Sequence, residues 1–267
     1  MPSLVTLVLP IYNMERFLAE CIRSIHAQTW TDLEVIAVLD GCTDRSEEIL
    51  NELKDERFVV IRKDKNEGVT AASNTGLDRA RGEFWARMDA DDVMDRRRLE
   101  KQVAYLRENP EVDIVGTWFD YIDGSGTVVQ DAFPFPATHA DIKDGFKVRN
   151  SIGGPTAMFR TERLRAVGGY DPEFSHAEDL RLFLKCLANG YVINNLPEVL
   201  YHYRQHGNQL NRVKHRETMR NTDISYREFG PRIWGKDAPD FHLGDPLAVR
   251  AFYKLKRMVR RTFASRD

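Results

Sequence analysis

Four aspartates lie within the seven residues from Asp89 to Asp95, directly after the apolar stretch "FWARM". Carboxylates this close repel one another, so a fold tolerates them on a solvated loop or where a cation neutralises them. Asp89 and Asp91 are two residues apart, and on an extended chain such residues point to the same side. The two carboxylates can therefore bind one hard cation together.

Mg²⁺ is usually held by one or two carboxylates together with substrate phosphates and water, and Mn²⁺ accepts similar oxygen ligands. A pair of aspartates with few further ligands therefore indicates an ion that arrives with a diphosphate. The alternative is an acidic, solvated turn that begins a helix near Arg96. The acids alone would favour that alternative, but the elements around them favour a metal site.

The first hundred residues alternate between buried strands and helices. Continuous apolar runs predict four strands, at Leu4–Leu9, Leu33–Leu39, Phe58–Arg62 and Glu83–Met88. Asn13 can cap the helix after the first strand, and small residues form a helix over Gly68–Gly82. This order predicts an α/β fold with a doubly wound, mostly parallel sheet, which binds ligands at the carboxyl ends of its strands. Three polar clusters follow those ends: "PIYN", "DGCTD" and "DADD".

The second half of the sequence is less regular. Its patterns predict a helix over Arg96–Asn109, a hairpin around "GSG", a strand at Thr156–Phe159, a helix over Ala177–Gly190 and short strands in "YVINNL" and "VLYHYR". No linker interrupts them. We therefore expect one catalytic domain over residues 1–212 and a helical C-terminal extension over residues 213–267.

Three segments in order resemble signatures of the family 2 glycosyltransferases: "VLPIYNMERFLAECIRSIHAQTWTDLEVIAVLDGCTD", "NEGVTAASNTGLDRARGEFWARMDADD" and "HAEDLRLFLKCLANGY". The resemblance covers about Leu4 to Asn208. It implies the A-type glycosyltransferase fold, a Rossmann-like sheet flanked by helices. In that fold a nucleotide-binding half (about 1–95) precedes an acceptor-binding half (about 96–212). It also implies an inverting enzyme that uses a nucleotide-diphosphate sugar with Mn²⁺ or Mg²⁺.

The resemblance also implies roles for residues on the donor side. Asp40 matches the acid that hydrogen-bonds a uracil or thymine ring, a role that suits a carboxylate because the ring presents an N3–H. The other matches are the nucleotide-bordering loop at Pro10, Tyr12 and Asn13, and the Asp-x-Asp motif of Asp89, Ala90 and Asp91, in which Asp91 is the direct metal ligand.

Asp179 matches the catalytic base in a Glu-Asp pair, and Glu178 falls on the acceptor side. Inverting transfer needs a base to deprotonate the acceptor hydroxyl, and a helix N-terminus keeps a carboxylate ionised. The alternative is that both acids only complement the helix dipole. The segment "HYRQHG" matches the closing stretch near the diphosphate, where Arg204 or His206 helps hold phosphate or metal.

The sequence departs from the family pattern at three positions. Leu39 stands where many members have the first of two acids, Cys42 replaces a usual Ser, and Ser73 replaces a common Arg. A Gln-x-x-Arg-Trp pattern is absent, as in the non-processive members that add one sugar.

The C-terminal segment Pro246–Asp267 carries seven basic residues and one acid. On a helix its basic and apolar residues form opposite stripes, so it either lies on an anionic bilayer or packs on the domain with a solvated basic face. The chain as a whole has a net charge of -2, which argues against binding nucleic acid. Three widely spaced cysteines predict reduced thiols and a cytoplasmic protein, peripheral at the inner face of the membrane if the first interpretation holds.

The sequence thus predicts a metal-dependent inverting glycosyltransferase. It would move one sugar from a UDP- or dTDP-linked donor, rather than a GDP-linked one, to a glycan or lipid-linked acceptor in bacterial-type surface polysaccharide synthesis. One alternative is a sugar nucleotidyltransferase, which would be expected to have a Gly-rich, basic first loop where this chain has "PIYNMER". Another is a non-catalytic nucleotide-sugar binding module, which need not retain Asp40, Asp89, Asp91 and Asp179 together.

Overall fold

The computed structural model describes residues 4–206 and 215–239. The strands are β1 Val5–Ile11, β2 Leu33–Asp40, β3 Phe58–Lys63, β4 Phe84–Arg87, β5 Val93–Met94, β6 Ile114–Ile122, β7 Val128–Phe133, β8 Met158–Arg160 and β9 Ile193–Arg204. The helices are α1 Leu18–His26, α2 Ser46–Leu53, α3 Val69–Arg79, α4 Arg98–Glu108, α5 His139–Gly145, α6 Thr161–Ala166, α7 Glu178–Ala188 and α9 His215–Trp234. Two short 3₁₀ helices lie at Gly154–Thr156 and Gly235–Asp237.

One nine-stranded sheet organises the chain, in the order β3-β2-β1-β4-β8-β6-β9-β5, with β7 paired to β6 off this path. Strands β3, β2, β1 and β4 are parallel to their neighbours. Beyond β4 the sheet is mixed, since β8 is antiparallel to both β4 and β6 whereas β6 and β9 are parallel. The predicted α/β fold is confirmed.

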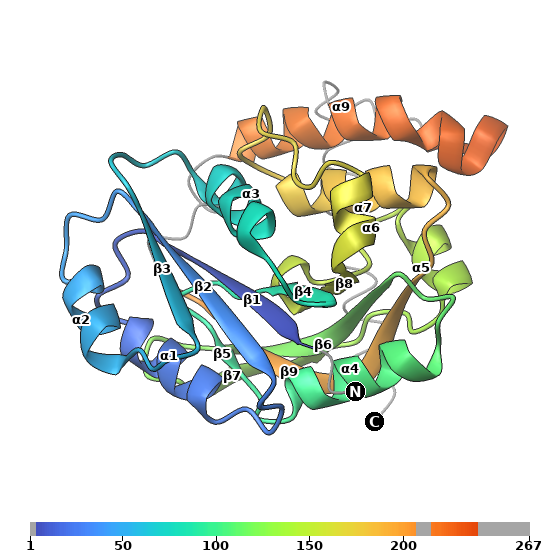
Figure 1. Cartoon of the computed structure of the whole chain (residues 1–267). Coiled ribbons are helices and arrows are strands. Elements are labelled where there is room, and N and C mark those ends of the chain that lie inside the picture. Colours follow the sequence, from blue (N-terminus) through green and yellow to red (C-terminus); the bar gives the residue numbers. More distant parts are fainter. Residues whose placement is uncertain (1–3, 207–214, 240–267) are drawn as a thin grey trace.

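Helices cover both faces of the sheet (Figure 1). Helices α3, α6, α7 and α9 lie on one side, and α1, α2 and α4 lie on the other. All eight residues of β2 are buried, as its unbroken apolar sequence predicts for a strand covered on both faces. Two apolar cores result, one between the sheet and the α3–α7–α9 layer and one between the sheet and α1 with α4.

Two details of the predicted elements are wrong. Asn13 does not cap the first helix, because α1 begins at Leu18 after Phe17 and Asn13 adopts a left-handed conformation with φ 52°. The stretches "YVINNL" and "VLYHYR" form one strand, β9, which pairs with β6 on both sides of an irregularity in register. Pro197 lies in that irregularity, where a residue without an amide hydrogen is tolerated.

The described part of the C-terminal extension contains helix α9, which packs on α7, and the short 3₁₀ helix Gly235–Asp237. Helix α9 buries one stripe of side chains: Asn221, Ser225, Tyr226, Phe229 and Ile233. The predicted domain boundary at 212 and the basic segment Pro246–Asp267 both lie outside the described residues. Within the described parts of the chain, every helix is too short or too polar to cross a bilayer.

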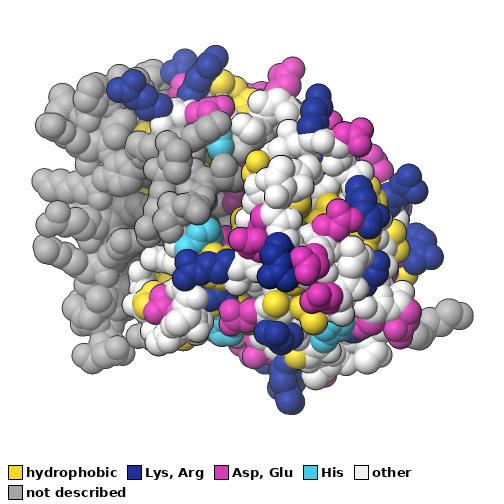
Figure 2. All heavy atoms as spheres, turned by 90° about the vertical axis from the view of Figure 1, so that its left-hand side faces the viewer, with side chains coloured by type: hydrophobic (Ala, Val, Ile, Leu, Met, Phe, Trp, Pro, Cys, Tyr) yellow, Lys and Arg dark blue, Asp and Glu magenta, His cyan; other side chains and the backbone are white. Residues whose placement is uncertain are grey.

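Charged side chains of both signs are interspersed over the face of the molecule shown in Figure 2, and neither sign gathers into a patch there.

Candidate active site

The three polar clusters meet at the carboxyl ends of the neighbouring strands β2, β1 and β4. Asn13 Oδ1, after β1, accepts a hydrogen bond of 2.8 Å from the backbone N–H of Thr43, after β2. Tyr12 is 42% exposed, which leaves its ring available to a ligand. The predicted nucleotide-bordering loop of Pro10, Tyr12 and Asn13 therefore lies beside the turn that follows Asp40.

Asp40 is buried at the end of β2 and binds the loop that precedes α3. Its Oδ1 accepts from the backbone N–H of Glu67 at 3.1 Å, and its Oδ2 accepts from that of Gly68 at 2.8 Å. Gly41 (φ 69°) lets this loop approach, since a Cβ there would come within 2.5 Å of the Asn66 nitrogen. Asp40 thus fixes the loop before α3 against the end of β2.

The acids after β4 form a turn that two residues of β9 hold in place. The backbone N–H of Asp92 donates to the Asp89 carbonyl at 3.2 Å. The Asp92 carboxylate is buried and accepts from the Tyr201 hydroxyl at 2.8 Å and from the Arg204 backbone N–H at 2.7 Å. With Asp92 directed inward, Asp89 and Asp91 keep partly exposed carboxylates, while the Ala90 side chain is buried.

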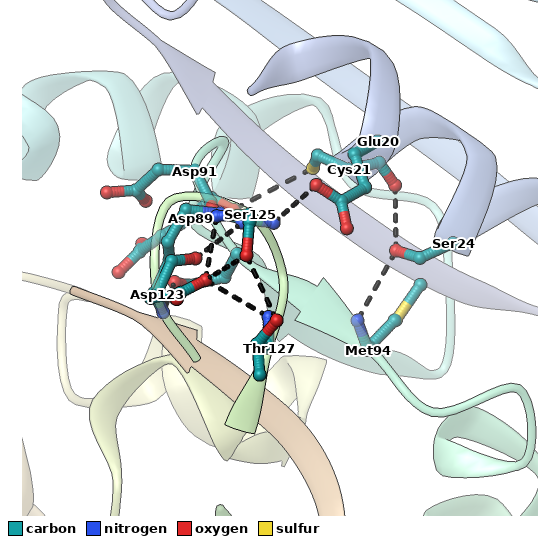
Figure 3. Close-up of polar contacts among 11 residues, drawn as sticks. Glu20, Cys21, Ser24, Asp89, Asp91, Met94, Asp123, Ser125 and Thr127 are labelled. Atoms are coloured by element: carbon teal, nitrogen blue, oxygen red, sulfur yellow. Dashed lines mark hydrogen bonds and ion pairs between the residues drawn. The ribbon is translucent and has the colours of Figure 1, made fainter. Parts of the chain in front are cut away.

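Asp91 pairs with His206, so the segment that contains His206 reaches the acidic turn after β4. His206 Nε2 lies 2.8 Å from Asp91 Oδ2. Burial and the nearby Asp89 raise the pKa of the Asp91 carboxyl, and His206 opposes this rise. In Figure 3 the Asp91 carboxylate points away from helix α1, which carries Glu20 and Cys21.

Arg204 does not fit the predicted role of a diphosphate ligand. Its side chain is fully buried, with Nε donating to the Asp91 carbonyl at 2.7 Å and Nη1 to the Asp123 carbonyl at 2.9 Å. Nη2 lies 2.6 Å from the Glu20 carboxylate. Arg204 therefore holds the acidic turn against α1 and the turn between β6 and β7, because its donors face these groups and not solvent.

A divalent ion fits the Asp89, Asp91 and His206 side chains in donor type, since they offer two carboxylates and an imidazole. Among the described residues, no three His, Cys, Asp or Glu side chains are grouped closely enough to hold a metal by themselves.

The Glu178–Asp179 pair begins helix α7, as predicted. Asp179 Oδ1 accepts from the Leu180 backbone N–H at 2.7 Å, and its Oδ2 lies 3.4 Å from Asn150 Nδ2. The carboxylate also lies close to Gly154, where a Cβ would come within 2.5 Å of Oδ2. Asp179 therefore faces the segment between α5 and β8, whereas Glu178 faces the sheet.

Arg87 lies between the two acidic sites, and it was not among the site residues predicted from the sequence. Its Nε lies 3.2 Å from Asp89 Oδ1, and its Nη1 lies 3.4 Å from Glu178 Oε1. Burial and the neighbouring Asp179 raise the pKa of Glu178 to about 7, and Arg87 opposes that rise. Burial also raises the pKa of Asp179, again against Arg87. The available signal was a basic residue inside the apolar strand that leads to the acids.

The fold and this pair of acidic sites can be compared with known proteins. The family model described as "Glycosyl transferase family 2" matches residues 6–167. The chain belongs to this glycosyltransferase family. An uncharacterized glycosyltransferase of Methanocaldococcus jannaschii, MJ1057, is 33% identical over 217 residues, which cover 79% of this chain and 74% of that protein. The amylovoran biosynthesis glycosyltransferase AmsE of Erwinia amylovora is 29% identical over 214 residues, 78% of each chain.

Solved glycosyltransferase structures share the fold. TarS 1-349 of S. aureus, solved in complex with UDP-GlcNAc, matches with a TM-score of 0.68 and 21% identity over 84% of this chain and 66% of that one. The mannosyltransferase PcManGT of Pyrobaculum calidifontis, solved with GDP-Man and Mn²⁺, matches with a TM-score of 0.69 and 20% identity over 95% and 74% of the two chains.

Proposed function

We propose that this glycosyltransferase is a metal-dependent, inverting enzyme that transfers one sugar from a nucleotide-diphosphate donor to a glycan or lipid-linked hydroxyl. The observation that carries the proposal is the position of Arg87, between Asp89 of the Asp-x-Asp motif and Glu178 of the acid pair. A single buried side chain lies against both acids, which supports a proposed diphosphate site next to a proposed base site. The similarity to AmsE supports a role in polysaccharide synthesis.

On the donor side, Asp89, Asp91 and His206 would hold Mn²⁺ or Mg²⁺. When bound, such an ion neutralises charge on the diphosphate leaving group. Tyr12, Asn13 and the loop fixed by Asp40 would enclose the nucleotide base. Among nucleotides we favour UDP and dTDP, because Asp40 can accept the pyrimidine N3–H.

The neighbouring structures do not decide between donors, since one was solved with UDP-GlcNAc and another with GDP-Man and Mn²⁺. Both nucleotides therefore belong in the test. Tight binding of GDP in preference to UDP and dTDP would contradict the role of Asp40.

On the acceptor side, Asp179 would take the proton of the attacking hydroxyl. Its carboxylate is held by the first turn of α7 and by Asn150, so its position does not depend on the substrate. Glu178 is directed to Arg87, which leaves Asp179 as the member of the pair that faces the segment after α5. The raised pKa of each carboxyl suits a base, because a stronger base accepts a proton more readily once it is ionised.

A donor panel tests the proposal. The purified protein is incubated with UDP-, dTDP- and GDP-sugars in Mn²⁺, and the release of nucleoside diphosphate is measured with and without saccharide acceptors. We expect release from a pyrimidine donor and its loss in Asp179→Asn. Release that Asp179→Asn leaves unchanged would contradict the assignment of the base, and binding without release would favour a non-catalytic module.

We also propose that the basic segment Pro246–Asp267 brings the enzyme to anionic membrane, where a lipid-linked acceptor lies. The support is its charge, seven basic residues against one acid. Flotation with anionic vesicles should decrease as salt rises, because the attraction is screened within a Debye length. Flotation that survives deletion of the segment would contradict this.

A further inference from the structure

The acid pair follows a residue with an unusual backbone conformation. Ala177 has φ 56° and ψ 29°, which is the left-handed region, and no side chain caps the helix that begins after it. Among the described non-glycine residues only Asn13 shares a positive φ. Such conformations persist where the surrounding structure holds them, and they cluster at functional sites. The contacts of the neighbouring residue His176 show what holds Ala177 in this conformation.

Helix α9 binds the backbone directly before Ala177. Asn221 Nδ2, from the buried stripe of α9, donates to the His176 carbonyl at 3.0 Å. The His176 ring is itself buried, and its Nε2 lies 3.5 Å from the Glu217 carboxylate of the same helix. The carbonyl of His176 belongs to the peptide that leads into Ala177. The Asn221 bond therefore fixes the direction from which the chain enters α7.

The same helix binds the segment on the other side of Asp179. The Tyr226 hydroxyl donates to the Phe146 carbonyl, and Trp234 Nε1 donates to the Lys143 carbonyl at 3.2 Å. The chain that leaves these residues supplies Asn150 and Gly154, which contact the Asp179 carboxylate. Helix α9 thus holds the two chain segments that flank Asp179. It lies beyond the part of the chain that the family model matches.

We propose that Asn221 is a positioning residue for transfer: its bond to the His176 carbonyl keeps Ala177 left-handed and so aims the Asp179 carboxylate at the acceptor hydroxyl. The proposal rests on the proposed role of Asp179 as base. It makes helix α9 part of the catalytic apparatus and not an appendage. It also predicts that changes in α9 affect the turnover rate without affecting donor binding, because the donor residues lie at the ends of β1, β2 and β4.

The test compares two substitutions on the same helix. Asn221→Leu removes the donor and keeps a buried side chain of similar size. The control is Thr222→Val, since the Thr222 hydroxyl bonds the Thr218 carbonyl of its own helix. We expect Asn221→Leu to lower kcat by about 10- to 100-fold, the loss that a displacement of about 1 Å can cause. The KM for donor and the donor affinity should stay within about twofold, and Thr222→Val should match the wild type.

Hydrogen exchange supplies a measurement that does not depend on activity. The amides of residues 176–180 should exchange faster in Asn221→Leu than in the wild type, while those of β1 are unchanged. Unchanged exchange at 176–180, an unchanged kcat, or a parallel loss of kcat and donor affinity would each overturn the proposal. If Asn221→Leu fails to fold, Asn221→Ala replaces it and should lower kcat in the same way, because it also removes the donor to the His176 carbonyl.

The proposed base is checked separately with Asp179→Asn. Full transfer by Asp179→Asn would contradict the assignment of the base, whereas the exchange rates would still decide whether Asn221 holds residues 176–180. Loss of transfer in Asp179→Asn together with wild-type kcat in Asn221→Leu would contradict the role of Asn221 alone.

Discussion

Replacing Arg87 with Met removes the cation that lies between Asp89 and Glu178. Two opposite charges 3.4 Å apart, the separation of Arg87 Nη1 and Glu178 Oε1, attract by about 5 kcal/mol at an effective dielectric constant of about 20. Solvent weakens this attraction, because the Asp89 side chain is 27% exposed and the Glu178 side chain is 15% exposed. Removing one partner of a buried pair costs about 3–5 kcal/mol, so we expect a loss near 3 kcal/mol at pH 8.

The loss should depend on pH in a defined direction. Without Arg87 the pKa of Glu178 rises above its present value of about 7. A carboxyl with a raised pKa in the folded protein destabilises it increasingly as pH rises through that pKa. The deficit of Arg87→Met should therefore be smaller at pH 6 than at pH 8, as measured by urea unfolding at the two values.

The matched control is Arg45→Met, which breaks a solvent-exposed pair with Glu48 and should leave the free energy of unfolding unchanged at both pH values. Equal deficits for Arg87→Met at pH 6 and pH 8 would refute the electrostatic argument. A stability within about 1 kcal/mol of the wild type at pH 8 would refute the burial argument as well.

Three further predictions concern the donor and the acid pair. Asp179→Asn should lower transfer by roughly 10²- to 10⁴-fold with donor affinity nearly unchanged; the same loss in Glu178→Gln, with full activity in Asp179→Asn, would reverse the assignment. Asp40→Ala should weaken UDP binding in calorimetry by about 1.5–3 kcal/mol, the value of a hydrogen bond to a charged group. It should also lower the melting temperature, because the backbone N–H groups of Glu67 and Gly68 lose their acceptor. The value of kcat/KM should rise with pH, because the base must be ionised and burial raises the pKa of Asp179 above its usual range; a rate that stays level down to pH 5 would contradict this.

The sequence predicted the parallel half of the fold well, because its strands are buried on both faces and their apolar runs are unbroken. The small residues of the helix after Gly68 also had a clear physical meaning. A Cβ on Gly76 would come within 2.3 Å of Val8, so α3 can lie close to β1 only with glycine there. The acids at the strand ends could be located for the same reason, since parallel strands bring their carboxyl ends to one edge.

What the sequence could not predict depends on contacts between distant segments. Arg204 looked available to a phosphate, but its acceptors at Asp91, Asp123 and Glu20 come from three separate elements. Asn13 looked like a helix cap, but its side chain binds Thr43 across the site. Ala177 carries no signal of its left-handed conformation, because the residue that holds it, Asn221, lies 44 positions further along the chain. Local patterns contain none of this information.

The central claim is that the acidic turn after β4 binds a divalent ion together with a nucleoside diphosphate. Calorimetric titration of UDP and dTDP into the protein, in Mn²⁺ and in EDTA, tests it most directly when the wild type is compared with Asp91→Asn. We expect tight binding to the wild type in Mn²⁺, much weaker binding in EDTA, and no difference between the two conditions in the variant, whose melting temperature without ligand should equal that of the wild type. Equal Mn²⁺-dependent binding by the wild type and Asp91→Asn would contradict the claim.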